Sequence, residues 1–155
     1  MKVGYRHSTT KDIEYSLNML TLDKHFAEDM FQHALGEDPD ECCGILGIRD
    51  GEVQKVYRMK NVTKSPYRYT MDPIQHLEVM RDLDANGFDG AIYHSHTHSE
   101  AFPSATDVRL AEPWPDTLFI LISLLDKSHP VLRAFLIDDT EIIEQETHTI
   151  GSSSS

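Results

Sequence analysis

The apolar positions of this chain follow two periods, and the period changes from segment to segment. Alternation at every second residue, or a short continuous apolar run, is typical of a strand, whereas apolar residues that return every three or four positions indicate one face of a helix. The pattern predicts strands at residues 19–22, 42–48, 52–59, 67–71, 90–96, 118–125, 131–137 and 141–147, and helices at 24–35, 73–86 and from about 104 onward.

Residues with strong capping and turn preferences mark the ends of these segments. Asp23 is expected to cap the first helix and Gly36 to end it. Asp72-Pro73 starts the second helix and Asn86-Gly87 ends it, while Asp50-Gly51 predicts a tight hairpin turn. The apolar stripe expected on the second helix consists of Ile74, Leu77, Met80 and Leu83.

The elements together predict an α/β fold in which a mixed, mostly antiparallel sheet is flanked by helices. The run at 118–125 is apolar on both sides, so we expect a central strand there. One domain is expected over residues 19–150. Residues 1–18 have no clear period and are predicted to be a poorly ordered extension, and the Gly-Ser sequence at 151–155 is predicted to be a flexible tail.

Charge and cysteine content narrow the classes of partner. The chain has 155 residues and a net charge of −12, from 14 Lys+Arg and 26 Asp+Glu. This balance argues against nucleic acid and an anionic membrane as partners, because both are bound mainly through Lys and Arg. There is no export signal, and the adjacent Cys42 and Cys43 cannot form a disulfide framework, so the cytoplasm is the expected location.

The most informative stretch carries alternating histidines. His94 and His96 lie two positions apart in a predicted strand, so their side chains point to the same face. Asp107 falls in the first turn of the next helix, where its carboxylate could supply a third ligand. Two imidazoles and one carboxylate would leave a tetrahedral zinc ion with one position open for water, which is the arrangement of a catalytic site.

Each of these residues also has an ordinary structural explanation. A single histidine on a strand is usually a core or surface residue, and the chain has nine histidines. Ser104 and Asp107 also fit a capping box, but that motif does not explain a histidine pair at the end of the preceding strand. A pair of histidines with one carboxylate also serves non-haem iron oxygenases. The pattern of zinc nucleobase deaminases is absent, because Cys42 and Cys43 are adjacent.

Together these residues resemble the JAMM (MPN+) zinc metallopeptidase family, whose signature is an upstream Glu, then His-Ser/Thr-His-Pro and Ser-x-x-Asp. The residues that match in identity and spacing are His94, Ser95, His96, Ser104 and Asp107, with Glu41 as the upstream acid. Thr97 replaces the usual Pro, a change that affects loop rigidity rather than metal binding. The resemblance covers about residues 19–148 and implies an MPN/JAB fold with cytidine-deaminase-like layering.

The resemblance also implies roles for individual side chains. His94, His96 and Asp107 would bind one zinc ion per chain. Glu41 would act as general base toward the zinc-bound water, and Ser104 would donate a hydrogen bond to the oxyanion.

Within the family the chain looks most like small bacterial and archaeal peptidases that process ubiquitin-like sulfur-carrier proteins. The implied reaction is hydrolysis of a peptide bond at the C-terminal Gly-Gly region of such a β-grasp carrier, whose tail would enter extended. The candidate substrate-binding segment is Asn61 to Tyr69, for which an ordinary surface loop is an equal explanation. The alternatives are an isopeptidase that removes a ubiquitin-like modifier and, less favoured, a non-catalytic ubiquitin-like-binding scaffold. The sequence leaves a homodimer open.

Four neighbouring residues are predicted to stay outside the metal site. His98 continues the alternation but is expected to lie on the rim, and Ser95 points to the opposite face and supports packing. Cys42 and Cys43 alternate faces, so they are expected to be small buried hydrophobes rather than joint ligands.

Overall fold

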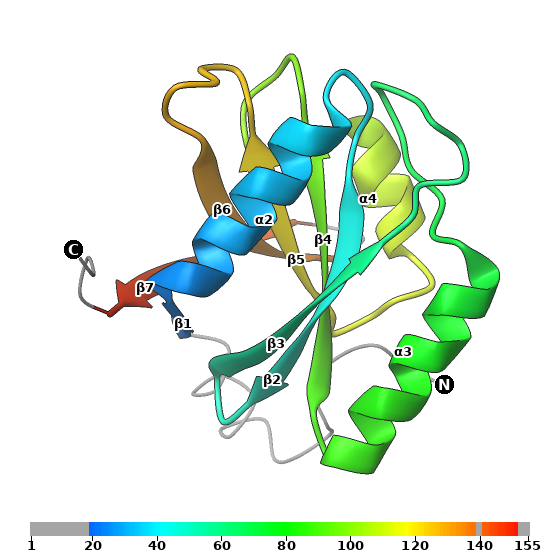
Figure 1. Cartoon of the computed structure of the whole chain (residues 1–155), viewed down its shortest axis with the longest axis vertical. Coiled ribbons are helices and arrows are strands. Elements are labelled where there is room, and N and C mark those ends of the chain that lie inside the picture. Colours follow the sequence, from blue (N-terminus) through cyan, green and yellow to red (C-terminus); the bar gives the residue numbers. More distant parts are fainter. Residues whose placement is uncertain (1–18, 139–140, 152–155) are drawn as a thin grey trace.

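Strands and helices follow one another in the predicted order, with one exception described below. The computed structural model describes residues 19–138 and 141–151 (Figure 1), so the predicted extension at 1–18 and, apart from Gly151, the predicted tail lie outside the described residues. The elements are β1 (Met19–Asp23), α2 (Lys24–Glu37), β2 (Cys43–Arg49), β3 (Glu52–Met59), α3 (Pro73–Asn86), β4 (Asp89–His96), α4 (Ala105–Ala111), β5 (Leu118–Ser123), β6 (Val131–Ile137) and β7 (Ile142–Ile150).

The strands of the described chain form one sheet in the order β1-β3-β2-β4-β5-β6-β7. The pairings β2–β3, β2–β4, β5–β6 and β6–β7 are antiparallel, while β4–β5 and both pairings of β1 are parallel. The predicted mixed, mostly antiparallel sheet is therefore confirmed. The sheet also closes into a barrel, because β1 pairs with both β3 and β7. Closure was not predicted, since it depends on contacts between the two ends of the chain that no local pattern reports.

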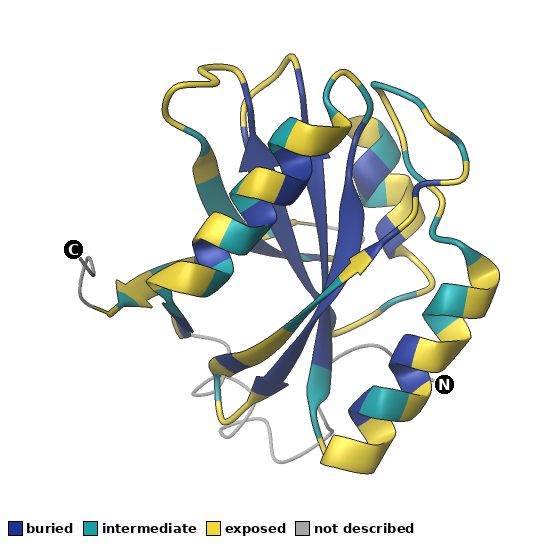
Figure 2. Ribbon diagram, in the orientation of Figure 1, coloured by how far each residue is buried: buried dark blue, intermediate teal, exposed yellow. Residues whose placement is uncertain are grey.

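Helices cover both faces of the sheet, and each face has its own apolar core. In Figure 1, α2 lies across one face of the central strands, and α3 and α4 belong to the other core. The helix residues buried in the two cores are Ala27, Met30 and Ala34 from α2, and Val79, Met80, Leu83 and Ala111 from α3 and α4. Strands β4 and β5 run between the cores and are buried along almost their whole length (Figure 2), which confirms the predicted central strand. No helix in the described ranges is long and apolar enough to cross a membrane.

The first helix begins as predicted but ends later. The Asp23 carboxylate caps α2 by accepting from the His25 N–H at 3.0 Å. The prediction that Gly36 ends the helix is wrong, because α2 continues to Glu37 and ends at Asp38. A glycine inside a helix costs only about 1 kcal/mol, whereas the residue before a proline disfavours helical backbone, so Pro39 sets the end of α2.

The second helix has the predicted ends but not the predicted buried face. Asp72 caps α3 and Gly87 ends it with a φ of 66°. Of the four stripe residues, Met80 and Leu83 are buried, but Ile74 is 71% exposed and Leu77 is 49% exposed. A spacing of three residues falls about 60° short of a full turn at each step, so a run at i, i+3, i+6 and i+9 turns away from a single face.

One predicted strand is absent. The segment at 67–71 forms no strand with a neighbour, and its only sheet contact among the described residues is an isolated bridge between Asn61 and Met71. The Thr70 N–H is bonded by a side chain rather than by the backbone of a neighbouring strand, because Asn61 Oδ1 accepts from it at 3.0 Å. The segment is therefore a loop connecting β3 to α3.

A buried histidine in the α2 core makes stability depend on pH. His33 is 6% exposed, and its Nδ1 lies 2.7 Å from the Tyr93 hydroxyl. Burial, helped by the charge of Arg58, lowers the pKa of His33 from 6.5 to about 4. Below pH 6.5 the His33 side chain is therefore protonated in the unfolded chain but stays neutral in the folded protein. The contribution of the neutral, buried His33 to stability is present above pH 6.5 and is lost as the pH falls toward 4.

We expect this histidine to remove about 2 kcal/mol from the free energy of unfolding between pH 7.5 and 5. Urea denaturation of the wild type and of His33→Gln at both pH values measures it. Glutamine does not titrate and can still bond the Tyr93 hydroxyl, so the variant should lose less stability on acidification. Equal losses in both proteins would contradict the assignment.

Candidate active site

Strand β4 presents two imidazoles on one face at its C-terminal end. His94 and His96 are buried, with 1% and 5% of their surfaces exposed, and their ring centroids lie 5.1 Å apart. Ser95 points to the other face, where its Oγ accepts from the Cys42 N–H at 2.8 Å. This bond ties β4 to β2, which agrees with the supporting role predicted for Ser95.

Helix α4 brings a carboxylate onto this pair. Ser104 and Asp107 form the capping box that the sequence allowed, with the Asp107 N–H donating to Ser104 Oγ at 3.1 Å and the Ser104 N–H donating to Asp107 Oδ2 at 2.9 Å. The cap fixes the Asp107 side chain so that Oδ1 lies 3.0 Å from His94 Nε2 and Oδ2 lies 2.9 Å from His96 Nε2. The Asp107 carboxylate can therefore take part in the capping box and face both histidines at the same time.

The three side chains fit a metal ion. His94, His96 and Asp107 are all buried and offer ligand atoms within 4.8 Å of one another. His94 Nε2 has no hydrogen-bond partner although it lies 3.0 Å from Asp107 Oδ1, so the two atoms approach without the alignment of a hydrogen bond. Ligands about 2.0–2.1 Å from a tetrahedral zinc ion are themselves ~3.3 Å apart and aim at the ion rather than at each other.

The hydrogen bonding of His96 supports the same conclusion. Its Nδ1 lies 2.8 Å from the Glu100 carbonyl oxygen, which can only accept, so Nδ1 carries the hydrogen. In the neutral ring Nε2 then presents a lone pair toward Asp107 Oδ2. Two lone pairs 2.9 Å apart require a positive charge near them, either a cation or a second ring proton.

Electrostatics in the cluster favour an ionised carboxylate. Burial opposes ionisation of Asp107, but the two imidazoles outweigh it and hold the pKa of Asp107 well below its usual value. Burial lowers the pKa of His94. Burial would also lower the pKa of His96, but the Asp107 carboxylate overcomes this and raises it. The cluster therefore holds an ionised carboxylate, which is the anionic ligand that a metal ion needs between two imidazoles.

Glu41 lies beside this cluster, two residues before β2. Strand β2 pairs with β4 so that Cys43 is opposite His94, and Glu41 therefore stands across from the end of β4. Its surface is only 4% exposed. Burial raises the pKa of the Glu41 carboxyl to about 8, the Asp107 charge adds to the rise, and His96 opposes it. A carboxyl with this pKa can exchange protons near neutral pH.

Thr97, which stands where the family has Pro, connects the two halves of the site. It is 2% exposed, and its hydroxyl donates to the Pro39 carbonyl oxygen at 3.2 Å. The bond joins the end of β4 to the segment that leads to Glu41. His98 is exposed, lies 2.7 Å from the same hydroxyl through Nδ1, and is outside the group of potential ligands in the described chain.

The two cysteines take no part in the site. Cys42 and Cys43 are free, fully buried and divided between the two apolar cores. Burial raises the pKa of both thiols to about 12, so neither is a thiolate at neutral pH. The prediction that they are small buried hydrophobes is confirmed.

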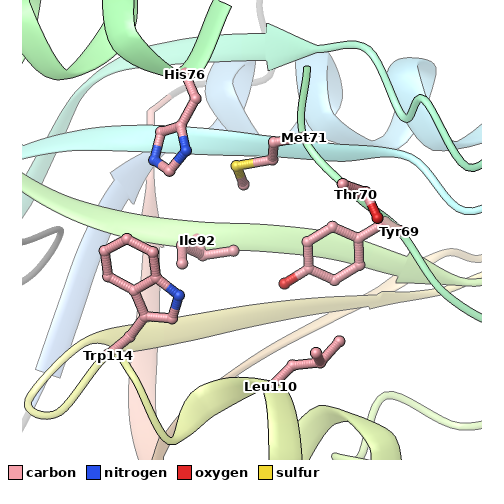
Figure 3. Close-up of a pocket in the computed structure, with 7 residues that line it drawn as sticks. All are labelled: Tyr69, Thr70, Met71, His76, Ile92, Leu110 and Trp114. Atoms are coloured by element: carbon pink, nitrogen blue, oxygen red, sulfur yellow. The ribbon is translucent and has the colours of Figure 1, made fainter. Parts of the chain in front are cut away.

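The loop between β3 and α3 contains the predicted substrate-binding segment Asn61 to Tyr69, and its last residue lies closer to the potential metal ligands than the sequence indicated. The ring of Tyr69 lies 4.6 Å from the ring of His94. Tyr69 also forms part of the wall of an adjacent pocket of about 270 Å³, shown in Figure 3. The other residues around this pocket are Thr70, Met71, His76, Ile92, Leu110 and Trp114. Sequence periodicity could not predict that Tyr69 and Trp114 line the same pocket, because they come from separate loops.

A group of potential metal ligands at the end of β4, with a buried acidic residue two positions before β2 and a capped helix beside it, fits a hydrolase-type metal centre on a JAB/MPN fold. Over residues 23–138 the sequence matches the family Prok-JAB, prokaryotic homologs of the JAB domain. The chain belongs to this family, and it is a small JAMM-type peptidase.

Individual relatives agree with this assignment. The chain is 37% identical over 124 residues to the CysO-cysteine peptidase of Mycobacterium tuberculosis, covering 78% of this chain and 84% of that protein. It is 34% identical over 94 residues to the desampylase of Haloferax volcanii, covering 58% of this chain and 67% of the relative. The solution structure of DSY2949 from Desulfitobacterium hafniense superposes with a TM-score of 0.78 at 37% identity, over 86% of this chain and 94% of that one.

Proposed function

We propose that this protein is a zinc metallopeptidase that hydrolyses a peptide bond at the C-terminal Gly-Gly region of a ubiquitin-like sulfur-carrier protein. The observation that carries the proposal is the buried group of His94, His96 and Asp107, with Glu41 buried beside it. These three side chains would hold one zinc ion per chain. The free, protonated cysteines fit a reducing compartment, and we expect the enzyme in the cytoplasm.

The residues divide the chemistry between them. When bound, a zinc ion would polarise the scissile carbonyl and lower the pKa of a bound water toward about 7. Glu41 would take the proton of the attacking water and deliver it to the leaving amine, for which a carboxyl pKa of about 8 is suited. The Glu100 carbonyl holds His96 by its Nδ1, so that Nε2 faces Asp107.

The substrate class rests on relatives. One is named for a CysO-cysteine substrate and another is named a desampylase, so both names indicate cleavage at a small protein partner. Removal of a residue from a carrier is favoured, because the relative that covers more of this chain is the CysO-cysteine peptidase. Isopeptidase activity is the second candidate, supported by the desampylase. The complete ligand set argues against a non-catalytic scaffold, which would be free to lose it.

A direct assay tests the proposal. Candidate carrier proteins ending in Gly-Gly, each with a C-terminal cysteine or a short extension, are incubated with zinc-loaded enzyme and with enzyme treated with a chelator, and their masses are measured. A lysine-linked conjugate of the same carrier tests the second candidate. We expect the mass to fall by that of the extension in the zinc arm only. Carriers and conjugates that stay intact in both arms would reject the proposal.

Ser104 has a proposed second role beyond the helix cap. Its Oγ accepts from the Asp107 N–H, and a hydroxyl that accepts still has its own hydrogen to donate, here to the oxyanion of the tetrahedral intermediate. Ser104→Ala should therefore lower kcat by roughly 10²–10³ and also lower stability by about 1 kcal/mol. Ser104→Thr, which keeps the hydroxyl, should restore both. If alanine lowers stability alone, Ser104 is only a cap.

A further inference from the structure

Asn61 is a buried amide whose hydrogen-bonding groups are all used. It lies just after β3 and is 7% exposed. Its Nδ2 donates to the Glu41 carbonyl oxygen at 2.9 Å and to the Arg68 carbonyl oxygen at 3.2 Å. Its Oδ1 accepts from the N–H groups of Thr63 at 3.1 Å and Thr70 at 3.0 Å. Only an amide side chain supplies two donors and an acceptor for two bonds in this arrangement.

One of these bonds reaches the residue that the mechanism uses as a base. The Glu41 carbonyl oxygen is held by Asn61, and the Glu41 N–H donates to the Ser65 carbonyl oxygen at 2.9 Å. Both backbone hydrogen bonds of Glu41 therefore go to the loop between β3 and α3. That loop also places the Tyr69 ring against His94. It thus contacts the general-base side and the metal-ligand side of the site together.

We infer that Asn61 is a positioning residue: it fixes the backbone of Glu41, and with it the direction of the carboxylate, and it keeps the β3–α3 loop folded against the site. The inference rests on the proposed function, because it assigns Asn61 a role in the same hydrolysis. A displacement of about 1 Å in a reacting group can cost on the order of 10²-fold in rate, so a bond to the backbone of the base can govern turnover without touching substrate.

Asn61→Asp removes the donor bonds of this side chain and keeps its acceptor bonds. The aspartate still accepts from the Thr63 and Thr70 N–H groups, which hold the loop, but presents no donor to the Glu41 carbonyl or to the Arg68 carbonyl. We expect kcat to fall roughly 10- to 100-fold, with KM changed less than about threefold and zinc content unchanged. Asn61→Ser, which can donate from a single hydroxyl, should keep more of kcat than Asn61→Asp. If the Asn61→Asp protein does not fold, the kcat of Asn61→Ser is compared with that of the wild type to decide the question.

Gln75→Met is the matched control. Gln75 is also an amide bonded to the backbone, accepting from the Lys60 N–H at 2.7 Å, one residue before Asn61, but it has no bond to Glu41. Its loss should leave kcat within about twofold of wild type. The inference is overturned if a folded Asn61 variant keeps wild-type kcat, if its loss lies only in KM, or if Gln75→Met lowers kcat equally. Wild-type protein that cleaves no carrier rejects the proposed function instead, so the two failures are distinguishable.

Discussion

Replacing Glu41 with Gln is expected to abolish turnover while leaving the metal bound. Glu41 belongs to no metal-ligand group in the described residues, so the variant should bind zinc in the same amount as wild type. The amide cannot take a proton from water, and general-base catalysis contributes typically 10²–10⁴-fold. We therefore expect kcat to fall by at least about 10²-fold. Carrier cleavage followed by mass spectrometry, and zinc content followed by emission spectrometry, measure the two properties on the same samples.

The matched control for this substitution is Glu37→Gln. Glu37 is an exposed carboxylate at the end of α2, only four positions before Glu41 in the chain, and the same isosteric change there should leave turnover unaffected. A Glu41→Gln protein that turns over near the wild-type rate would remove the general base from the mechanism. Loss of zinc along with turnover would instead mean that Glu41 acts on the metal rather than on the attacking water.

The grouping of the three potential metal ligands could be predicted from sequence because their spacing is short. Residues two positions apart in one strand, such as His94 and His96, share a face, and Asp107 follows at the start of the next helix, where the capping box with Ser104 fixes its side chain. Glu41 is more than fifty positions upstream of His94, and no periodicity places it near the histidines. Its place followed from the family signature alone. The pairing of β2 with β4 supplies the physical reason.

The remaining differences arise where side chains or distant segments override a local preference. The predicted strand at 67–71 has suitable residues, but the Asn61 amide satisfies its backbone and holds it as a loop. Tyr69 against His94 could not be predicted, since it depends on how that loop is fastened. Closure of the barrel also could not be predicted from local sequence, because β1 and β7 come from opposite ends of the described chain. The first case depends on a side chain within the same loop, and the other two depend on contacts between distant parts of the sequence.

Replacing Asp107 with Asn should have the opposite signature to the change at Glu41, namely loss of the metal itself. The carboxylate places one oxygen within 3.0 Å of His94 Nε2 and the other within 2.9 Å of His96 Nε2. An asparagine would keep one oxygen, lose the negative charge and direct an N–H at one imidazole. Changes in groups that merely support metal ligands cost about 10–100-fold in metal affinity, so loss of a ligand charge should exceed about 100-fold.

Competition with a chelating dye measures this affinity, and Asp72→Asn provides the control. Asp72 is also an aspartate at a helix start, where it caps α3, and asparagine caps as well as aspartate. That control should therefore keep both zinc affinity and stability. The Asp107 variant should lose zinc and, with it, the part of the stability that zinc binding adds. If Asp107→Asn retains zinc at wild-type affinity, the third zinc ligand must be a residue other than Asp107. The proposed coordination by His94, His96 and Asp107, with one position open for water, would then be wrong.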